Sequence, residues 1–162
     1  SVSLKVQYTA SDNSRYFGAI LDDSGTLKRY HCGIDWDGTF TICLQNSYPA
    51  TTPKDSNVNV FYISSTECKI NDTVATGNWT TGLPESLAFW LFNRNAQGRD
   101  SWTQNYCKAK LYSCDMLENG VSVRNFIPAK RDSDNKIGLY DTVSTTFFTD
   151  ANGGNFIGGN PV

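Results

Sequence analysis

Residues 107–127, CKAKLYSCDMLENGVSVRNFI, carry the clearest fold signal in the chain. In residues 107–117, apolar and aromatic side chains alternate with polar ones, as in a strand with one buried face. Glu118-Asn119-Gly120 follows, and an Asn-Gly pair between two such runs is a strong signal for a tight turn. Residues 121–127 then resume the alternation. The stretch therefore predicts two long β-strands joined by a turn.

The rest of the chain repeats this pattern of short alternating segments that end at turn residues. Aromatic residues make up 13% of the 162 residues, a composition that favours half-buried sheets. Apolar residues spaced as in a helix are missing. The other expected strands are residues 4–8, 16–21, 27–34, 39–44, 58–64, 67–70, 73–76, 87–92, 137–140 and 146–149. About twelve strands with turns at this spacing predict a single all-β domain over residues 1–162, a sandwich or a barrel.

The charge and the longest apolar run exclude two classes of partner. The formal net charge is −2 and the pI about 5.3, with Lys and Arg scattered singly. No basic face is available for phosphates, so we expect no nucleic-acid partner. The apolar run at residues 87–92 has six residues, whereas a membrane-spanning helix needs about 20. We therefore expect no membrane insertion.

The cysteines argue against a zinc site and leave a disulfide open. They are Cys32, Cys43, Cys68, Cys107 and Cys114, with no C-x-x-C pair and a single His in the chain. If Asp37-Gly38 forms a two-residue turn, Cys32 lies opposite Cys43, with Cα atoms about 5.5 Å apart. That separation permits a disulfide. A longer turn would separate the pair, and buried free cysteines are common.

The carboxy-terminal third carries an ordered set of motifs. They are KAKLYSC (108–114), Asn119-Gly120, RNFIP (124–128), GLYD (138–141) and FFT (147–149). Upstream, YFGA (16–19) and CKINDTV (68–74) extend the match. Together these motifs resemble the end of the concanavalin A-like (laminin-G-like) modules that close large surface proteins of gut bacteria and tail or fibre proteins of their phages.

This resemblance implies a fold, a partner and a location. The fold would be a jelly-roll sandwich of two curved antiparallel sheets, and the partner a polysaccharide or glycan receptor. The location would be extracellular or on a virion surface. Such modules usually open with a strand ahead of the segment that matches residues 3–9. We therefore expect the chain to be part of a larger parent protein, or to have that edge filled by another segment or copy.

The acidic residues and the single His form no pattern suited to catalysis. Sandwich glucanases place acids two residues apart on one strand. No acid stands two positions from any glutamate, namely Glu67, Glu85 and Glu118. Asp35 and Asp37 have this spacing but flank an expected turn, where Asp more often bonds the backbone. His31 and Cys32 are adjacent on a strand and point to opposite faces, so we expect no enzyme.

Sugar binding has a more specific signal in the polar loop 93–106. A pyranose stacks its apolar face on an aromatic ring and offers hydroxyls to amide and guanidinium groups. Trp102 supplies a ring in this loop, and no apolar periodicity surrounds it. The polar candidates in the loop are Arg94, Asn95, Arg99 and Gln104. We predict that the loop binds a sugar, with Trp102 as the ring platform and Arg94 and Arg99 as donors.

Trp36 and Trp79 stand in polar turns and are further candidates for a ring platform. For both, the alternative is a ring that folds back and caps one end of the sandwich. Residues 132–135, DSDN, resemble a calcium loop without its later Glu, so a solvated turn is favoured and no cofactor is expected. The competing function is a structural or assembly module of a virion or surface protein that binds no sugar.

Overall fold

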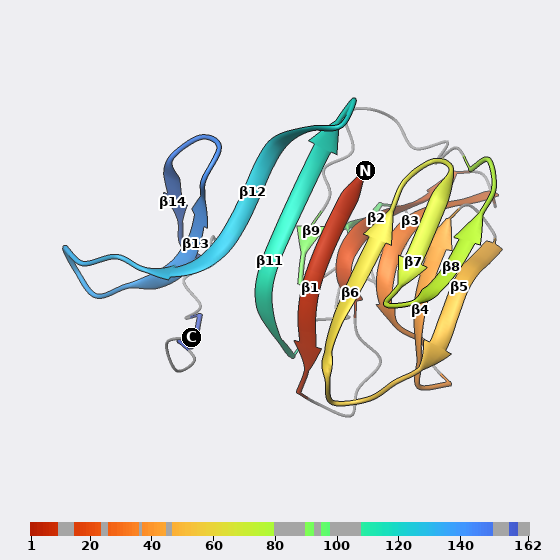
Figure 1. Ribbon diagram of the computed structural model, residues 1–162, viewed down its shortest axis with the longest axis horizontal. Helices are drawn as coiled ribbons and strands as arrows, with labels where there is room; N and C mark the ends of the chain where they lie inside the picture. Colours follow the sequence, from red (N-terminus) through yellow and green to blue (C-terminus); the bar gives the residue numbers. More distant parts are fainter. Residues whose placement is uncertain are drawn as a thin grey trace.

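The computed structural model describes residues 1–9, 15–23, 26–35, 37–44, 47–79, 90–92, 95–97, 108–150 and 156–158. The regular secondary structure of these residues consists of strands alone, and the strands form two sheets (Figure 1). The all-β prediction is therefore confirmed. Paired strands run antiparallel, except that β10 and β2 are parallel.

We call the eight-stranded sheet the large sheet and the six-stranded sheet the small sheet. The large sheet has the order β14 (Thr146–Phe148), β13 (Ile137–Asp141), β12 (Val121–Lys130), β11 (Ala109–Glu118), β1 (Val2–Tyr8), β6 (Val58–Ile63), β7 (Glu67–Ile70) and β8 (Thr73–Thr76). The small sheet has the order β10 (Asn95–Gln97), β2 (Arg15–Asp23), β3 (Thr26–Ile34), β4 (Thr39–Leu44) and β5 (Ser47–Pro53), and β9 (Trp90–Leu91) also pairs with β2.

β1 lies in the interior of the large sheet, between β11 and β6. Its apolar residues Val2, Leu4 and Val6 are buried, whereas Lys5 between them is exposed, so only one face of the strand enters the core. Val2 pairs with Met116 and Ile63, and each residue from Ser3 to Gln7 likewise has a partner on both sides. Strands that are far apart in the sequence therefore meet on either side of β1.

The two sheets pack face to face through aromatic rings. Phe61 of the large sheet makes edge contacts with Tyr16 and Phe40 of the small sheet, at centroid distances of 5.3 Å and 5.7 Å. All three rings are buried. Tyr30 also crosses between the sheets, where its hydroxyl donates to the carbonyl oxygen of Ile63 at 3.3 Å. The described strands thus form a β-sandwich around a shared apolar core.

The turn between β3 and β4 is longer than the two residues considered above. Asp35 N–H donates to Thr39 O, and Gly38 N–H donates to Asp35 O, both at 2.9 Å. Asp35 and Thr39 therefore pair across the turn, which contains one residue more than an Asp37-Gly38 turn. The register of the whole hairpin shifts by one residue as a result.

This shift contradicts the pairing of Cys32 with Cys43. Cys32 lies opposite Ile42, and Cys43 lies opposite His31. Because side chains alternate between faces, the two thiols point to opposite sides of the small sheet. Both cysteines are buried and neither is in a disulfide.

The Asn119-Gly120 turn between β11 and β12 is confirmed. Asn119 and Gly120 have φ angles of 50° and 79°, and a type I′ turn requires positive values at both positions. Glu118 pairs with Val121 directly beside the turn. The twist of this turn matches that of the strands, which allows both to run for ten residues.

Three segments differ from the expected strand pattern. Asn95–Gln97 lies in the polar loop expected at residues 93–106, yet it forms β10, which pairs with β2. Ser47–Pro53 resembles a polar connection, yet it forms β5, the last strand of the small sheet beside β4. Proline lacks an N–H donor but is tolerated at a sheet edge, so Pro49 and Pro53 are compatible with this position. Of the strand expected at residues 87–92, residues 90–92 are described, and Trp90–Leu91 forms β9, which pairs with β2.

Candidate functional site

Most of the residues predicted to bind a sugar lie outside the described ranges. These residues are Trp36, Arg94, Arg99, Trp102 and Gln104. Asn95 is the first residue of β10, where it pairs with Ala19 of β2. The role of the 93–106 loop in sugar binding therefore stays a prediction.

Trp79 is described, and it folds back onto the sandwich. Its backbone N–H donates to Ser65 O at 2.7 Å, and its half-buried ring packs against the apolar core. Gly77 lies against the ring, since a Cβ there would come within 2.5 Å of ring atom Cζ2. This placement corresponds to the capping alternative and leaves part of the ring accessible.

The turn at residues 132–135 is closed by an ion pair. The Asp134 carboxylate accepts hydrogen bonds from Arg131 Nε at 2.9 Å and Nη2 at 2.6 Å. These bonds from Arg131 lower the pKa of Asp134 to about 2. Within the described ranges, no three His, Cys, Asp or Glu side chains are grouped so that they could hold a metal ion.

The face of the large sheet that points away from the small sheet, here called the outer face, carries partly exposed aromatic rings. In Figure 1 this sheet lies in front of the small sheet, so the outer face points toward the viewer. Strand alternation places on it Tyr62, Tyr112, Tyr140 and Phe147. A cation lies near three of these rings. The distances to the ring centroid are 5.7 Å from Lys69 to Tyr62, 6.0 Å from Lys5 to Tyr112 and 4.9 Å from Arg131 to Phe147. The face thus presents rings and positive charges together.

Aliphatic side chains add to the apolar area of the outer face. Val58 and Val60 on β6 are 38% and 39% exposed, and Val74 on β8 is 52% exposed. Single exposed apolar residues are normal, whereas several on one face with aromatic rings indicate a surface for a partner or ligand.

A β-bulge between β1 and β11 positions Tyr112. Lys5 lies opposite Ser113, but the next residue, Val6, lies opposite Leu111. Tyr112 is therefore the extra residue of β11 and has no partner on β1. Bulges re-aim a side chain relative to the regular ladder, and here the phenol ring extends toward Gln7.

Hydrogen bonds hold this ring in place. Tyr112 Oη donates to Gln7 Oε1 at 3.0 Å, and Gln7 Nε2 donates to Ser56 O at 2.8 Å. Lys110 lies directly opposite Gln7, and Lys5 approaches the ring from the neighbouring position on β1. We call Lys5, Gln7, Lys110 and Tyr112 the Tyr112 cluster. It combines a ring, a fixed amide and two ammonium groups on one open face.

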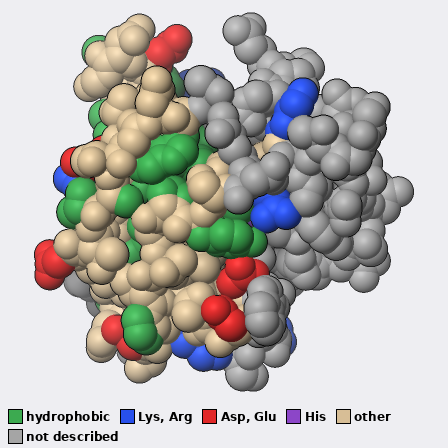
Figure 2. Space-filling view, turned by 90° about the vertical axis from the view of Figure 1, so that its right-hand side faces the viewer, with side chains coloured by type: hydrophobic (Ala, Val, Ile, Leu, Met, Phe, Trp, Pro, Cys, Tyr) green, Lys and Arg blue, Asp and Glu red, His purple; other side chains and the backbone are tan. Residues whose placement is uncertain are grey.

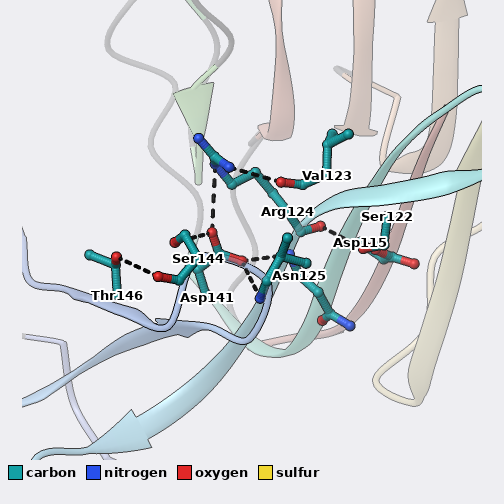
Figure 3. A network of polar contacts seen from close by, with 9 residues as sticks. Asp115, Ser122, Val123, Arg124, Asn125, Asp141, Ser144 and Thr146 are labelled. Carbon is teal, nitrogen blue, oxygen red and sulfur yellow. Dashed lines mark hydrogen bonds and ion pairs between the residues drawn. The ribbon is translucent and has the colours of Figure 1, made fainter.

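At the other end of the large sheet, Asp141 anchors the turn between β13 and β14 to β12 (Figure 3). Its buried carboxylate accepts hydrogen bonds from Asn125 N–H (2.9 Å), Val143 N–H (3.1 Å) and Ser144 Oγ (2.6 Å). Arg124 Nε lies 3.6 Å away. Burial opposes ionisation, but these hydrogen bonds and the Arg124 charge outweigh it and lower the pKa of Asp141. The network therefore stabilises the turn.

The pKa values of other carboxyl groups are also lowered. Hydrogen bonds from Thr39 lower the pKa of Asp37, and those from Asn59 and Asn57 lower the pKa of Asp55. A general acid in catalysis needs a pKa raised toward the working pH. Asp37, Asp55, Asp134 and Asp141 instead act as ionised acceptors in turns and networks.

The edge where β5 and β8 lie side by side is a second apolar surface. Figure 2 looks onto this side of the molecule and shows hydrophobic side chains gathered near the middle of the described surface. Tyr48 on β5 is 46% exposed, and Val74 on β8 is 52% exposed. β8 is the last described strand of the large sheet and has no proline, so its edge suits pairing with another strand.

No protein-family model, curated protein or solved structure matches the chain. The described residues also contain no helix that could span a membrane.

Sequence reasoning did not identify Tyr62 or Tyr112 as site residues. It selected rings in polar loops, whereas these two stand on strands. A signal was available in the strand pattern, because Tyr62 stands between the apolar residues Phe61 and Ile63, and adjacent residues of a strand point to opposite faces.

Proposed function

We propose that this domain is a non-catalytic carbohydrate-binding module that attaches a larger extracellular or virion-surface protein to a polysaccharide. We further propose that its sandwich is the concanavalin A-like jelly roll that the motif order in residues 108–149 resembles. The observation that carries the binding proposal is the outer face of the large sheet, with partly exposed rings beside amide and ammonium groups. A sugar ring stacks on such a platform while its hydroxyls bond the polar groups.

The carboxyl groups support binding rather than hydrolysis. Glycoside hydrolysis uses a pair of carboxyl groups, one of which carries a raised pKa. Among the described residues, the carboxyl groups with a shifted pKa are those of Asp37, Asp55, Asp134 and Asp141, and all four pKa values are lowered. Their oxygens accept hydrogen bonds within turns and networks.

The decisive experiment removes one ring at a time from the outer face. Tyr62→Ala and Tyr112→Ala are measured by calorimetry against polysaccharides first identified on a glycan array. Loss of a stacked ring should reduce the free energy of binding by about 0.5–1.5 kcal/mol, which corresponds to about 2- to 13-fold weaker binding.

Tyr48→Ala is the matched control for these variants. Tyr48 is an exposed tyrosine of the small sheet, where Arg29 Nη1 donates to its hydroxyl at 3.1 Å. Rings on a sheet also stabilise it through cross-strand contacts, so melting temperatures are measured for all three variants. Unchanged affinity in both Tyr62→Ala and Tyr112→Ala would remove the outer face as the binding surface.

The 93–106 loop is proposed as a second contact for the same ligand, with Trp102 as its ring. Under this proposal the Trp102 ring faces the ligand and not the core, so Trp102→Ala should weaken binding and leave the melting temperature nearly unchanged. A buried Trp replaced by Ala would destabilise the fold by about 3–5 kcal/mol. A large fall in melting temperature, or undiminished binding, would contradict a role for Trp102.

A second candidate function is assembly through the β8 edge, favoured by the exposed apolar side chain of Val74 on a strand without proline. Val74→Lys should block strand addition, because charged side chains protect sheet edges. Light scattering would then show a dimer for the wild type and the 18.0 kDa monomer for the variant. A wild type that stays monomeric at high concentration excludes this function.

A further inference from the structure

The charged side chains of the Tyr112 cluster are two lysines, Lys5 and Lys110. Lys5 and Lys110 are exposed, and the structure, as far as it is described, gives neither of them an ion pair. Elsewhere on the same face, Lys69 Nζ pairs with Glu67 Oε1 at 2.9 Å. Among the described residues, the positive charge of the Tyr112 cluster is therefore not compensated by an ion pair.

Asp115, an acid on this face, is engaged elsewhere. Asp115 lies opposite Ser3, which makes it a diagonal neighbour of Lys5 across the β1–β11 ladder. Its Oδ1 accepts a hydrogen bond from Ser122 Oγ on β12. This bond directs the carboxylate toward β12, away from the lysine.

The two lysines flank the ring and the amide of the cluster. Lys110 lies opposite Gln7, and Lys5 is two residues from Gln7 on the same face. Along the ladder, Lys5 and Lys110 therefore lie on either side of Tyr112, the bulge residue between Leu111 and Ser113. Two ammonium groups on flexible stems can therefore reach both sides of a sugar that stacks on Tyr112.

We propose that the ligand of the Tyr112 cluster is an acidic polysaccharide whose sugar units carry carboxylate groups. This proposal rests on the carbohydrate-binding function proposed above. A neutral polymer on Tyr112 would cover two ammonium groups without supplying a counter-charge, and partly desolvating an unpaired charge is unfavourable. Carboxylates supply the counter-charge and form charge-assisted hydrogen bonds with both lysines.

The test compares acidic polysaccharides with their own neutral forms. Polygalacturonate, alginate and hyaluronan are each measured by calorimetry, alongside the same polymer after reduction of its carboxyl groups. We expect an acidic form to bind and its reduced form to bind more weakly. Raising the ionic strength from 0.01 M to 1 M should also weaken binding, because the Debye length falls from about 30 Å to about 3 Å.

Two double variants locate the charge effect. Lys5→Gln with Lys110→Gln should weaken binding of the acidic form about 2- to 30-fold, the range for two exposed ion pairs. Lys130→Gln with Lys136→Gln makes the same change in net charge away from the cluster and should leave binding nearly unchanged. Tyr112→Ala should weaken binding as well.

Each other outcome overturns a defined part of the proposal. Equal, Tyr112-dependent binding of the reduced polymers would refute acidic specificity and leave the carbohydrate-binding function standing. Equal losses in the two lysine variants would show attraction by net charge alone and refute the site. If none of the polymers binds in either form, and the glycan array is also negative, both proposals fail.

Discussion

Replacing Asp141 with alanine should detach the turn between β13 and β14 from β12. The buried carboxylate accepts hydrogen bonds from Asn125 N–H, Val143 N–H and Ser144 Oγ at 2.6–3.1 Å. Two of these three donors are backbone groups that cannot move away without distorting a strand or a turn. Alanine leaves both without their acceptor.

The magnitude follows from these two donors. A buried N–H that loses its acceptor costs about 1–3 kcal/mol, so the pair gives about 2–6 kcal/mol. Val143 is 46% exposed, so water can replace part of the lost acceptor. We therefore expect a loss of stability in the lower half of this range, about 2–4 kcal/mol. Arg124 is half exposed and 3.6 Å away, so its ion pair adds at most about 1 kcal/mol.

The free energy of unfolding is measured by urea denaturation and the melting temperature by calorimetry. For a chain of this length, each 1 kcal/mol lowers the melting temperature by about 2–4 °C, so Asp141→Ala should lower it by about 4–16 °C. Asp141→Asn retains one acceptor oxygen in nearly the same shape, so its melting temperature should fall less than that of Asp141→Ala. At pH 7 the wild-type contribution is complete, because the pKa of Asp141 is lowered on folding, and it disappears as the pH falls through that lowered pKa.

The reasoning would be refuted if Asp141→Ala melted within about 2 °C of the wild type, less than the smallest shift expected for this change. It would also fail if Asp141→Asn lost as much as Asp141→Ala, since the remaining oxygen would then have no role. Asp134→Ala is the matched control, because this exposed aspartate also accepts hydrogen bonds in a turn but bonds no buried backbone donor. Its melting temperature should stay close to that of the wild type.

Three further predictions concern the fold. Gly18 and Gly120 both have positive φ (147° and 79°), but a Cβ at Gly18 would lie 2.3 Å from His31 Cβ, whereas nothing lies within 4 Å at Gly120. Gly120→Ala should therefore destabilise the fold by about 1–2 kcal/mol, and Gly18→Ala by clearly more. Equal losses of the free energy of unfolding in urea denaturation would contradict the close contact between residue 18 and His31. An NMR titration of Asp134 should have its midpoint near pH 2 and move toward 3.8 in Arg131→Gln, and an unmoved midpoint would exclude Arg131 as the cause. Burial raises the pKa of Cys68 to about 11 and of Cys114 to about 12, so iodoacetamide should modify them only after unfolding. Mass spectrometry that finds either cysteine labelled in the native protein, or a Cys32–Cys43 disulfide, would oppose the structure.

The strand-forming segments could be predicted because each carries its own signal. Alternation in residues 107–117 and 121–127 shows which side chains share a face, and Asn119-Gly120 is suited to the positive φ angles of the turn. Ser47–Pro53 escaped prediction because its prolines suggest a connection, and only a position at the sheet edge makes them compatible with a strand.

The register of the β3–β4 hairpin could not be read from its sequence. Asp37-Gly38 suits a two-residue turn, but the hydrogen bond from Asp35 to Thr39 closes a turn one residue longer. That single residue decides which cysteine faces the core, because side chains alternate with a period of two. Cys32 belongs to the core cluster, whereas Cys43 on the other face accepts a contact from Arg29 Nη1 at 3.7 Å.

The sequence by itself determined that this chain forms strands and which residues of each expected strand lie on the same face. The tertiary structure decided which strands are neighbours, and with that it assembled the Tyr112 cluster. Tyr112 and Gln7 are 105 positions apart in the chain, and they meet because β11 pairs with β1 and a bulge turns the ring toward Gln7. Local alternation is a property of each strand alone, whereas pairing depends on how all the apolar faces are buried together between two sheets.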